Sequence, residues 1–201
     1  MPVRLIVWSD YLCPWCYNAA VRIRRLEEEF GDQLEVTYRS FLLRPEPDPR
    51  RTLEQFRRYT ESWLRPAADA DAGTFRVWAS DAGPPSHSVP PHLVAKAAAT
   101  LGRDAFRTMH ERLLHAYFAE SRDITDAATL QAIWAEAGLP PAEFARSADP
   151  MLRHAVLAEH AAALEAGVTG VPAVQMEGRD TALVGAHPIE TWRRWIARSL
   201  A

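Results

Sequence analysis

The pattern of hydrophobic and polar positions near the N-terminus predicts a strand, a helix and a second strand, in that order. Residues 3–8 form a short, β-rich apolar run, which predicts a buried strand. After a loop, apolar residues at helical spacing alternate with charges up to Gly31, which predicts a helix that ends there. Residues 34–43 then predict a second strand. A helix that connects two strands of one sheet implies a parallel strand pair.

The middle of the chain has a different pattern. Prolines at 45, 47 and 49 interrupt the regular structure and indicate a boundary. The next hundred residues carry apolar stripes at helical spacing and are predicted to be mainly helical. Thr52 and Gln55 have the spacing of a capping box, and Asp126 is expected to cap a later helix.

The last fifty residues predict a helix, two short strands and a terminal helix. Asp149 and Pro150 are suited to the N-cap and the first position of a helix that ends at Gly167. Residues 168–176 predict a turn leading into a strand, and residues 181–185 a second strand after a hairpin turn. The order of elements is therefore βαβ, a helical block and αββα, which makes the fold class α/β.

Composition and charge exclude some classes of function. The chain has 201 residues, 48% hydrophobic and 24% charged, and a formal net charge of -3. Nucleic-acid binders usually carry a basic patch, so we expect no nucleic-acid partner. The apolar run at 5–8 is too short for a signal sequence, and no stretch approaches the length of a membrane span. We therefore expect a cytoplasmic protein without membrane association.

Cys13 and Cys16 are the only cysteines, and their C-x-x-C spacing fits three interpretations. A zinc site needs two more ligands, and the seven histidines are distant in sequence. The cysteines are alternatively two small buried hydrophobes, or a redox pair. Their position where a strand leads into a helix favours the redox pair, because a helix N-terminus stabilises a thiolate. We predict no metal site.

In the redox interpretation the two cysteines have different roles. Cys13 is expected to be the exposed thiol that attacks a disulfide, and Cys16, one turn into the helix, to resolve the mixed disulfide. Pro14 suits the first helical turn, where a missing N–H costs little. Trp15 and Tyr11 flank the sulfurs, where they either form an apolar rim for substrate or pack against the helix.

The segment "GVTGVPAV" at residues 167–174 is the second half of the predicted site. Pro172 stands at the entrance to a β-rich segment, a position where proline is otherwise disfavoured. Together with the C-x-x-C motif, this segment resembles a thioredoxin-like active site, which implies that the X-Pro bond is cis and that the backbone of Val171 points at the substrate, which pairs with it like an added strand. Gly170 is expected to relax the turn before it.

The motifs "SDYLCPWCYNAA" and "GVTGVPAV" together resemble the DsbA-like thioredoxin superfamily, specifically its FrnE-like branch. Phe41, Leu43 and Pro45 match a further segment of that branch. The resemblance implies a thioredoxin fold at residues 1–45 and 151–201, interrupted by an all-α insertion at 46–150. It also implies thiol-disulfide oxidoreductase activity, which is disulfide reduction, oxidation or isomerisation. No bound cofactor is expected, with glutathione as a candidate co-substrate.

Two other classes of function stay open. Related branches include 2-hydroxychromene-2-carboxylate isomerase-like and kappa-class glutathione transferase-like proteins, which generally activate glutathione with a serine. They do not need a second cysteine, so Cys16 favours redox chemistry. A non-catalytic role, such as a chaperone, is the third class. The expected partner is a disulfide-containing protein or a small thiol, and the terminal helix either closes the sheet or packs in a homodimer.

Overall fold

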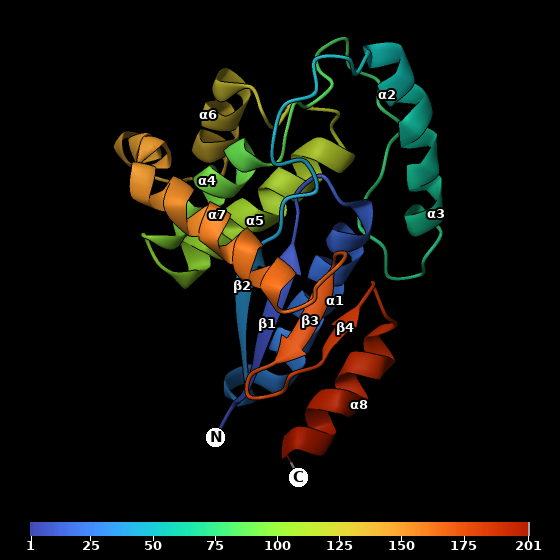
Figure 1. Ribbon diagram of the computed structural model, residues 1–201, viewed down its shortest axis with the longest axis vertical. Helices are drawn as coiled ribbons and strands as arrows, with labels where there is room; N and C mark the ends of the chain where they lie inside the picture. The colour runs from blue at the N-terminus through green and yellow to red at the C-terminus, as the bar shows by residue number, and fades with distance from the viewer. Residues whose placement is uncertain (201) are drawn as a thin grey trace.

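The computed structural model describes residues 1–200. Its centre is a mixed four-stranded sheet (Figure 1). The strands lie in the order β2-β1-β3-β4 and are, in chain order, β1 (Val3–Ser9), β2 (Leu34–Ser40), β3 (Ala173–Met176) and β4 (Ala182–Val184). The first two strands are parallel, and β3 is antiparallel to both β1 and β4. The predicted βαβ unit and C-terminal strand pair are therefore confirmed.

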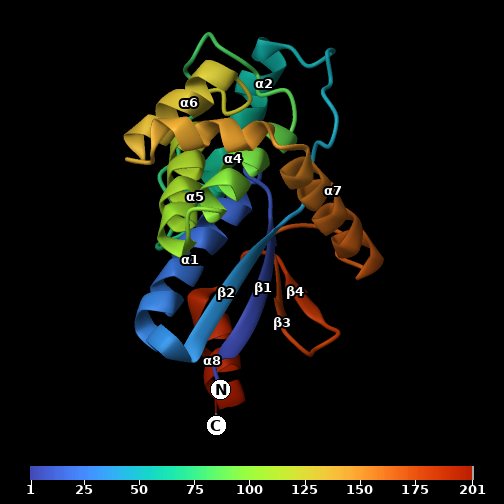
Figure 2. The same cartoon turned by 90° about the vertical axis from the view of Figure 1, so that its left-hand side faces the viewer.

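Alternation along β1 divides its side chains between two helical layers (Figure 2). One face packs against α1 (Pro14–Phe30) and α8 (Ile189–Leu200), and its buried residues are Val3, Leu5, Val7, Ala19, Ile23, Leu26, Trp192 and Ile196. The other face carries Trp8, which clusters with Ala163 of α7 (Pro150–Glu165). Burying both faces accounts for the nearly continuous apolar run that predicts this strand.

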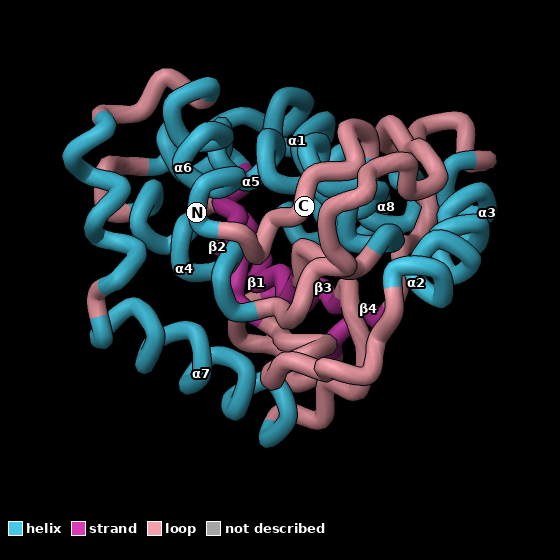
Figure 3. Tube along the Cα trace, turned by 90° about the horizontal axis from the view of Figure 1, so that it is seen from above, coloured by secondary structure: helices cyan, strands magenta, loops and turns pink. Residues whose placement is uncertain are grey.

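Between β2 and α7 the chain is helical, as predicted (Figure 3). The elements are α2 (Leu53–Thr60), α3 (Leu64–Ala67), α4 (Val89–Ala99), α5 (Arg103–Phe118) and α6 (Ala127–Glu136), with 3₁₀ helices η2 (Glu61–Trp63) and η3 (Pro141–Ala148). A further 3₁₀ helix, η1 (Gly31–Gln33), lies earlier in the chain, between α1 and β2. The capping box of Thr52 and Gln55 forms, and Asp126 and Asp149 cap their helices. The helical core includes Tyr11 and Leu12 from the loop after β1.

Two elements differ from the sequence prediction. Strand β2 ends at Ser40 rather than at Leu43, because the backbone N–H groups of Leu42 and Leu43 donate to the side chains of His160 and Asp10 instead of to a neighbouring strand. The segment at 141–148, for which the sequence predicts no separate element, forms the 3₁₀ helix η3.

Arg22 lies in α1 and bonds to two other segments of the chain, the loop after α3 and the turn before α8. Its side chain is 4% exposed and forms ion pairs of 2.6 Å with both Asp69 and Asp71. The same guanidinium donates to the backbone carbonyls of Ala186 and His187, at 2.7 and 3.1 Å. A planar fork with five N–H donors suits this set of acceptors. Arg22 therefore fixes the loop after α3 and the turn before α8 to the outside of α1.

We expect Arg22→Met to lower the free energy of unfolding by about 3 kcal/mol, because it leaves two carboxylates and two carbonyls without their donor. Urea unfolding of the purified variants measures the change. Arg4→Met is the matched control, since Arg4 is 59% exposed in its pairs with Glu35 and Glu177 and should have a much smaller effect. Equal effects of the two substitutions would contradict the role of Arg22.

Candidate active site

Cys13 occupies the N-cap of α1, and Pro14 is the first residue of the helix. The Cys13 N–H donates to the Asp10 carbonyl at 3.1 Å, and the Cys16 N–H donates to the Cys13 carbonyl at 3.1 Å. These two bonds form the tight turn by which the chain leaves β1 and enters the helix. The Cys13 side chain thus lies at the positive end of the helix dipole.

The turn before β3 lies directly opposite Cys13. The Val171–Pro172 peptide bond is cis, and the Cys13 thiol donates to the Val171 carbonyl at 3.4 Å. The two segments meet because Trp8 of β1 is paired with Ala173 of β3. A Cβ at Gly170 would lie 3.8 Å from Val184, an ordinary contact, so space alone does not require glycine there.

Both thiols are free and buried. Cys13 is 5% exposed, so the expectation of an exposed thiol is wrong; the Val171 carbonyl lies against its sulfur. Cys16 is 1% exposed. Burial raises the pKa of the Cys16 thiol well above its usual value, and the nearby Cys13 adds to this, whereas the Asp10 amide and the Ser9 hydroxyl oppose it.

The two aromatic residues beside the cysteines lie in different environments. Trp15 is 39% exposed at the surface. Tyr11 is buried rather than at a rim, and its hydroxyl is 2.9 Å from Nδ1 of His110. The Tyr11 ring also packs edge-on against His92, with 4.9 Å between ring centres. A contact with substrate therefore stays a prediction for Trp15, while Tyr11 connects the active-site loop to the helical insertion.

Asp10 is a site residue whose environment the sequence does not reveal. It is fully buried, and its two carboxylate oxygens accept hydrogen bonds from the Leu12 and Leu43 amides at 2.7 and 2.6 Å. Desolvation raises the pKa of Asp10 to about 6. The Ser88 hydroxyl and the Leu12 and Leu43 amides lower this pKa, but by smaller amounts. Asp10 thereby joins the loop after β1 to the segment after β2.

Within residues 1–200, no group of three or more histidine, cysteine or acidic side chains is placed to hold a metal ion. None of the helices in this range has the length and apolar character needed to cross a membrane. His87, one of the histidines near the start of α4, is half-buried and bonded to the Ser86 hydroxyl at 2.8 Å.

The sheet order, the helical insertion and the paired cysteines at the start of α1 define a thioredoxin-like protein. The chain belongs to the DSBA-like thioredoxin domain family, whose model matches residues 4–197. This confirms the resemblance found in the sequence, and it covers nearly the whole chain. No curated protein matches the chain in sequence.

Several solved structures share the fold. A structure from Nitrosomonas europaea has a TM-score of 0.82 at 18% identity, covering 100% of this chain and 98% of its own. The cytosolic disulfide reductase DsbM from Pseudomonas aeruginosa has a TM-score of 0.76 at 23% identity, covering 98% of both chains. A 2-hydroxychromene-2-carboxylate isomerase has a TM-score of 0.70 at 17% identity, covering 98% of this chain and 96% of its own. At these identities the likeness shows a common fold.

The raised pKa of Asp10 makes a prediction about stability. The folded protein binds this proton more tightly than the unfolded chain, whose aspartates have a pKa of about 3.9, so ionising Asp10 costs stability as pH rises. Asp10→Asn cannot ionise, so we expect the stability of the wild type, measured relative to this variant, to fall by about 3 kcal/mol between about pH 4 and pH 7. Urea unfolding of both proteins across this range measures the difference. A difference that stays constant with pH would contradict the burial effect.

Proposed function

We propose that the chain is a thiol-disulfide oxidoreductase that acts through Cys13 and Cys16. The proposal rests on one arrangement: the Cys13 thiol at the N-cap of α1, 3.4 Å from the Val171 carbonyl, with the buried Cys16 one turn behind it. Cys13 stands where the first N–H groups of α1 have no partner within the helix, and a thiolate is the reactive form in disulfide exchange.

The reaction proceeds in two exchanges. The Cys13 thiolate attacks one sulfur of the substrate disulfide, and the other sulfur leaves with the electron pair of the broken bond. Cys16 then attacks the Cys13 sulfur, which releases the second substrate sulfur and leaves a Cys13–Cys16 disulfide. The direction in use depends on the reduction potentials of the protein and its partner, so reduction, oxidation and isomerisation all use this chemistry.

Glutathione is the small thiol that we propose as co-substrate. One similar structure is DsbM with GSH, with a TM-score of 0.68 at 22% identity. DsbM is described as cytosolic, which supports our proposal that this chain works in the reducing cytoplasm. Disulfide-containing proteins are the other proposed substrates, and the exposed Trp15 offers them an apolar contact beside Cys13.

A glutathione-dependent isomerase is the second candidate, and the likeness to 2-hydroxychromene-2-carboxylate isomerase supports it. The two candidates differ in their use of Cys16. Resolution of a mixed disulfide requires this second thiol, whereas activation of glutathione for isomerisation does not. The position of Cys16, buried directly behind Cys13, therefore favours the redox reaction.

We expect Cys16→Ser to accumulate a mixed disulfide on Cys13 when it is incubated with oxidised glutathione, because no thiol remains to resolve it. Intact-protein and peptide mass spectrometry locate the adduct. In Cys13→Ser the adduct should be absent, and the rate of disulfide exchange should fall about a hundredfold or more.

Two results would contradict this assignment. Exchange that survives Cys13→Ser would mean that another group is the nucleophile. The second candidate would be established instead by two observations together. Cys16→Ser would isomerise a chromene carboxylate with glutathione at the wild-type rate, and the wild type would show no disulfide exchange.

A further inference from the structure

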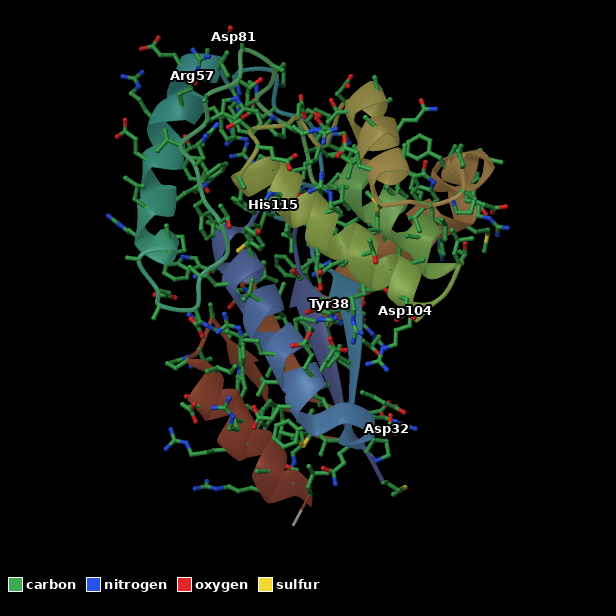
Figure 4. All side chains as sticks on the ribbon, turned by 180° about the vertical axis from the view of Figure 1, so that it is seen from behind. Asp32, Tyr38, Arg57, Asp81, Asp104 and His115 are labelled. Atoms are coloured by element: carbon green, nitrogen blue, oxygen red, sulfur yellow. The ribbon has the colours of Figure 1, made fainter. Side chains whose placement is uncertain are left out.

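A hollow of about 460 Å³ lies between α1 and α5, which are neighbouring helices on the face of the molecule seen in Figure 4. This volume falls in the range of pockets that bind small molecules. On α1 its wall consists of the residues at 17, 20, 21, 24 and 25, which share one face of the helix. Neither cysteine and no residue of the turn before β3 is in the wall. The chemistry proposed for the two thiols therefore does not account for this hollow.

Two contacts join α1 to α5, one near each end of the hollow. The Tyr17 hydroxyl is 3.3 Å from Nδ1 of His115, which Figure 4 labels on α5. About two turns further along α1, Nε of Arg24 is 3.7 Å from a carboxylate oxygen of Glu111. These contacts fix the two helices relative to each other, so the hollow exists before a ligand enters it.

The buried residues of the wall form an apolar floor. Leu114 is fully buried, and Tyr17 and Ala20 are 8% and 7% exposed. Val21 is half-buried and packs against the same hydrophobic core. Ala20 contributes a single methyl group on the α1 side, which leaves room above the floor. An apolar ring that covers these side chains removes apolar surface from water, which favours its binding.

The exposed residues of the wall form a rim with an excess of positive charge. Three arginines line it, Arg24 and Arg25 from α1 and Arg112 from α5, against one glutamate, Glu111. The chain as a whole has a net charge of -3, so the charge at this rim is opposite in sign to that of the chain. A rim of this kind attracts an anion, and arginine suits a carboxylate because its planar fork can donate two parallel N–H bonds.

Carboxylates outside the hollow hold two of these arginines and leave N–H donors unused. Arg112 donates to Glu120 and Glu136, at 3.3 and 2.7 Å. Arg24 pairs through Nε with Glu28 at 2.9 Å. A guanidinium has five N–H donors, so each of the two groups keeps several for a ligand.

Arg25 is the arginine of the rim that is most free to meet a ligand. It is exposed, and within residues 1–200 it forms no ion pair or hydrogen bond through its side chain, whereas Arg22 and Arg24 of the same charged run are both paired. A carboxylate bound beside Arg25 therefore gains a charge-assisted hydrogen bond without breaking an existing one.

We propose that this hollow is a binding site for a small organic anion, namely a flat apolar ring system that carries a carboxylate. The ring lies on the floor, and the carboxylate accepts N–H groups from Arg25 and Arg112 at the rim. The volume of the hollow fits a small molecule rather than a macromolecule. Glu111, 52% exposed at the same rim, disfavours ligands that carry several negative charges. The inference goes beyond the proposed function, because the site uses neither thiol.

2-Naphthoate tests the site in the full-length protein, because it joins one carboxylate to a flat apolar body. Isothermal titration calorimetry measures its dissociation constant. 2-Naphthamide keeps the apolar body without the charge, and inorganic phosphate keeps a charge without the body. We expect 2-naphthoate to bind at least about tenfold more tightly than either compound, because only 2-naphthoate uses both the floor and the rim.

Variants of the rim and the floor locate the bound 2-naphthoate. Arg25→Gln should weaken its binding about tenfold, since it removes a charged donor. Arg153→Gln is the matched control, because Arg153 is exposed on α7, forms no ion pair within residues 1–200 and is not in the wall. Val21→Phe places a larger side chain in the hollow and should abolish binding. Melting temperatures check folding, and Arg25→Gln decides alone if Val21→Phe is unstable.

Four results would overturn the proposal. Equal weakening by Arg25→Gln and Arg153→Gln would show a response to the net charge of the protein alone. Equal binding of 2-naphthoate and 2-naphthamide, or of 2-naphthoate and phosphate, would show that the rim or the floor is not used. The third result is the absence of 2-naphthoate binding at millimolar concentrations. The fourth is binding that is lost in Cys13→Ser but kept in Arg25→Gln, which would place the ligand at the active site instead.

Discussion

The antiparallel pairing of β1 with β3 is the constraint on which the site depends. It sets Trp8 against Ala173, so the chain that leaves β1 for α1 and the chain that enters β3 meet at one edge of the sheet. Cys13 and Val171 are 158 positions apart in sequence and in contact for this reason. Pro172 is tolerated because it stands before the first residue of β3, where no ladder hydrogen bond is lost.

The helical insertion is part of the site. Its apolar core includes Tyr11 and Leu12 from the loop between β1 and α1, and Tyr17 from α1. Packing and the hydrogen bond between Tyr11 and His110 thus hold the cysteine loop from the side opposite the sheet. The same arrangement leaves two small cavities between α5 and β2, and His110 lies in the wall of both.

Features that depend on local sequence could be predicted, and features that depend on distant contacts could not. The βαβ unit and the caps at Thr52, Asp126 and Asp149 follow from periodicity and short-range hydrogen bonds. The burial of Cys13 and Tyr11 depends on segments far away in the chain. Arg22 lies in a charged stretch that is typical of a solvated helix face, and only the folded loop at 69–71 and the turn at 186–187 give it partners. The boundaries at 45 and 150 stay a prediction.

The central claim is that Cys13 and Cys16 form a reversible two-electron couple. Equilibrating the protein across a series of reduced-to-oxidised glutathione ratios, with quenching and peptide mapping, measures this directly. We expect a single transition in which one peptide linking Cys13 to Cys16 replaces two free thiols, with a slope that corresponds to two electrons. Glutathione attached to Cys13 at every oxidising ratio, with Cys16 always free, would contradict it.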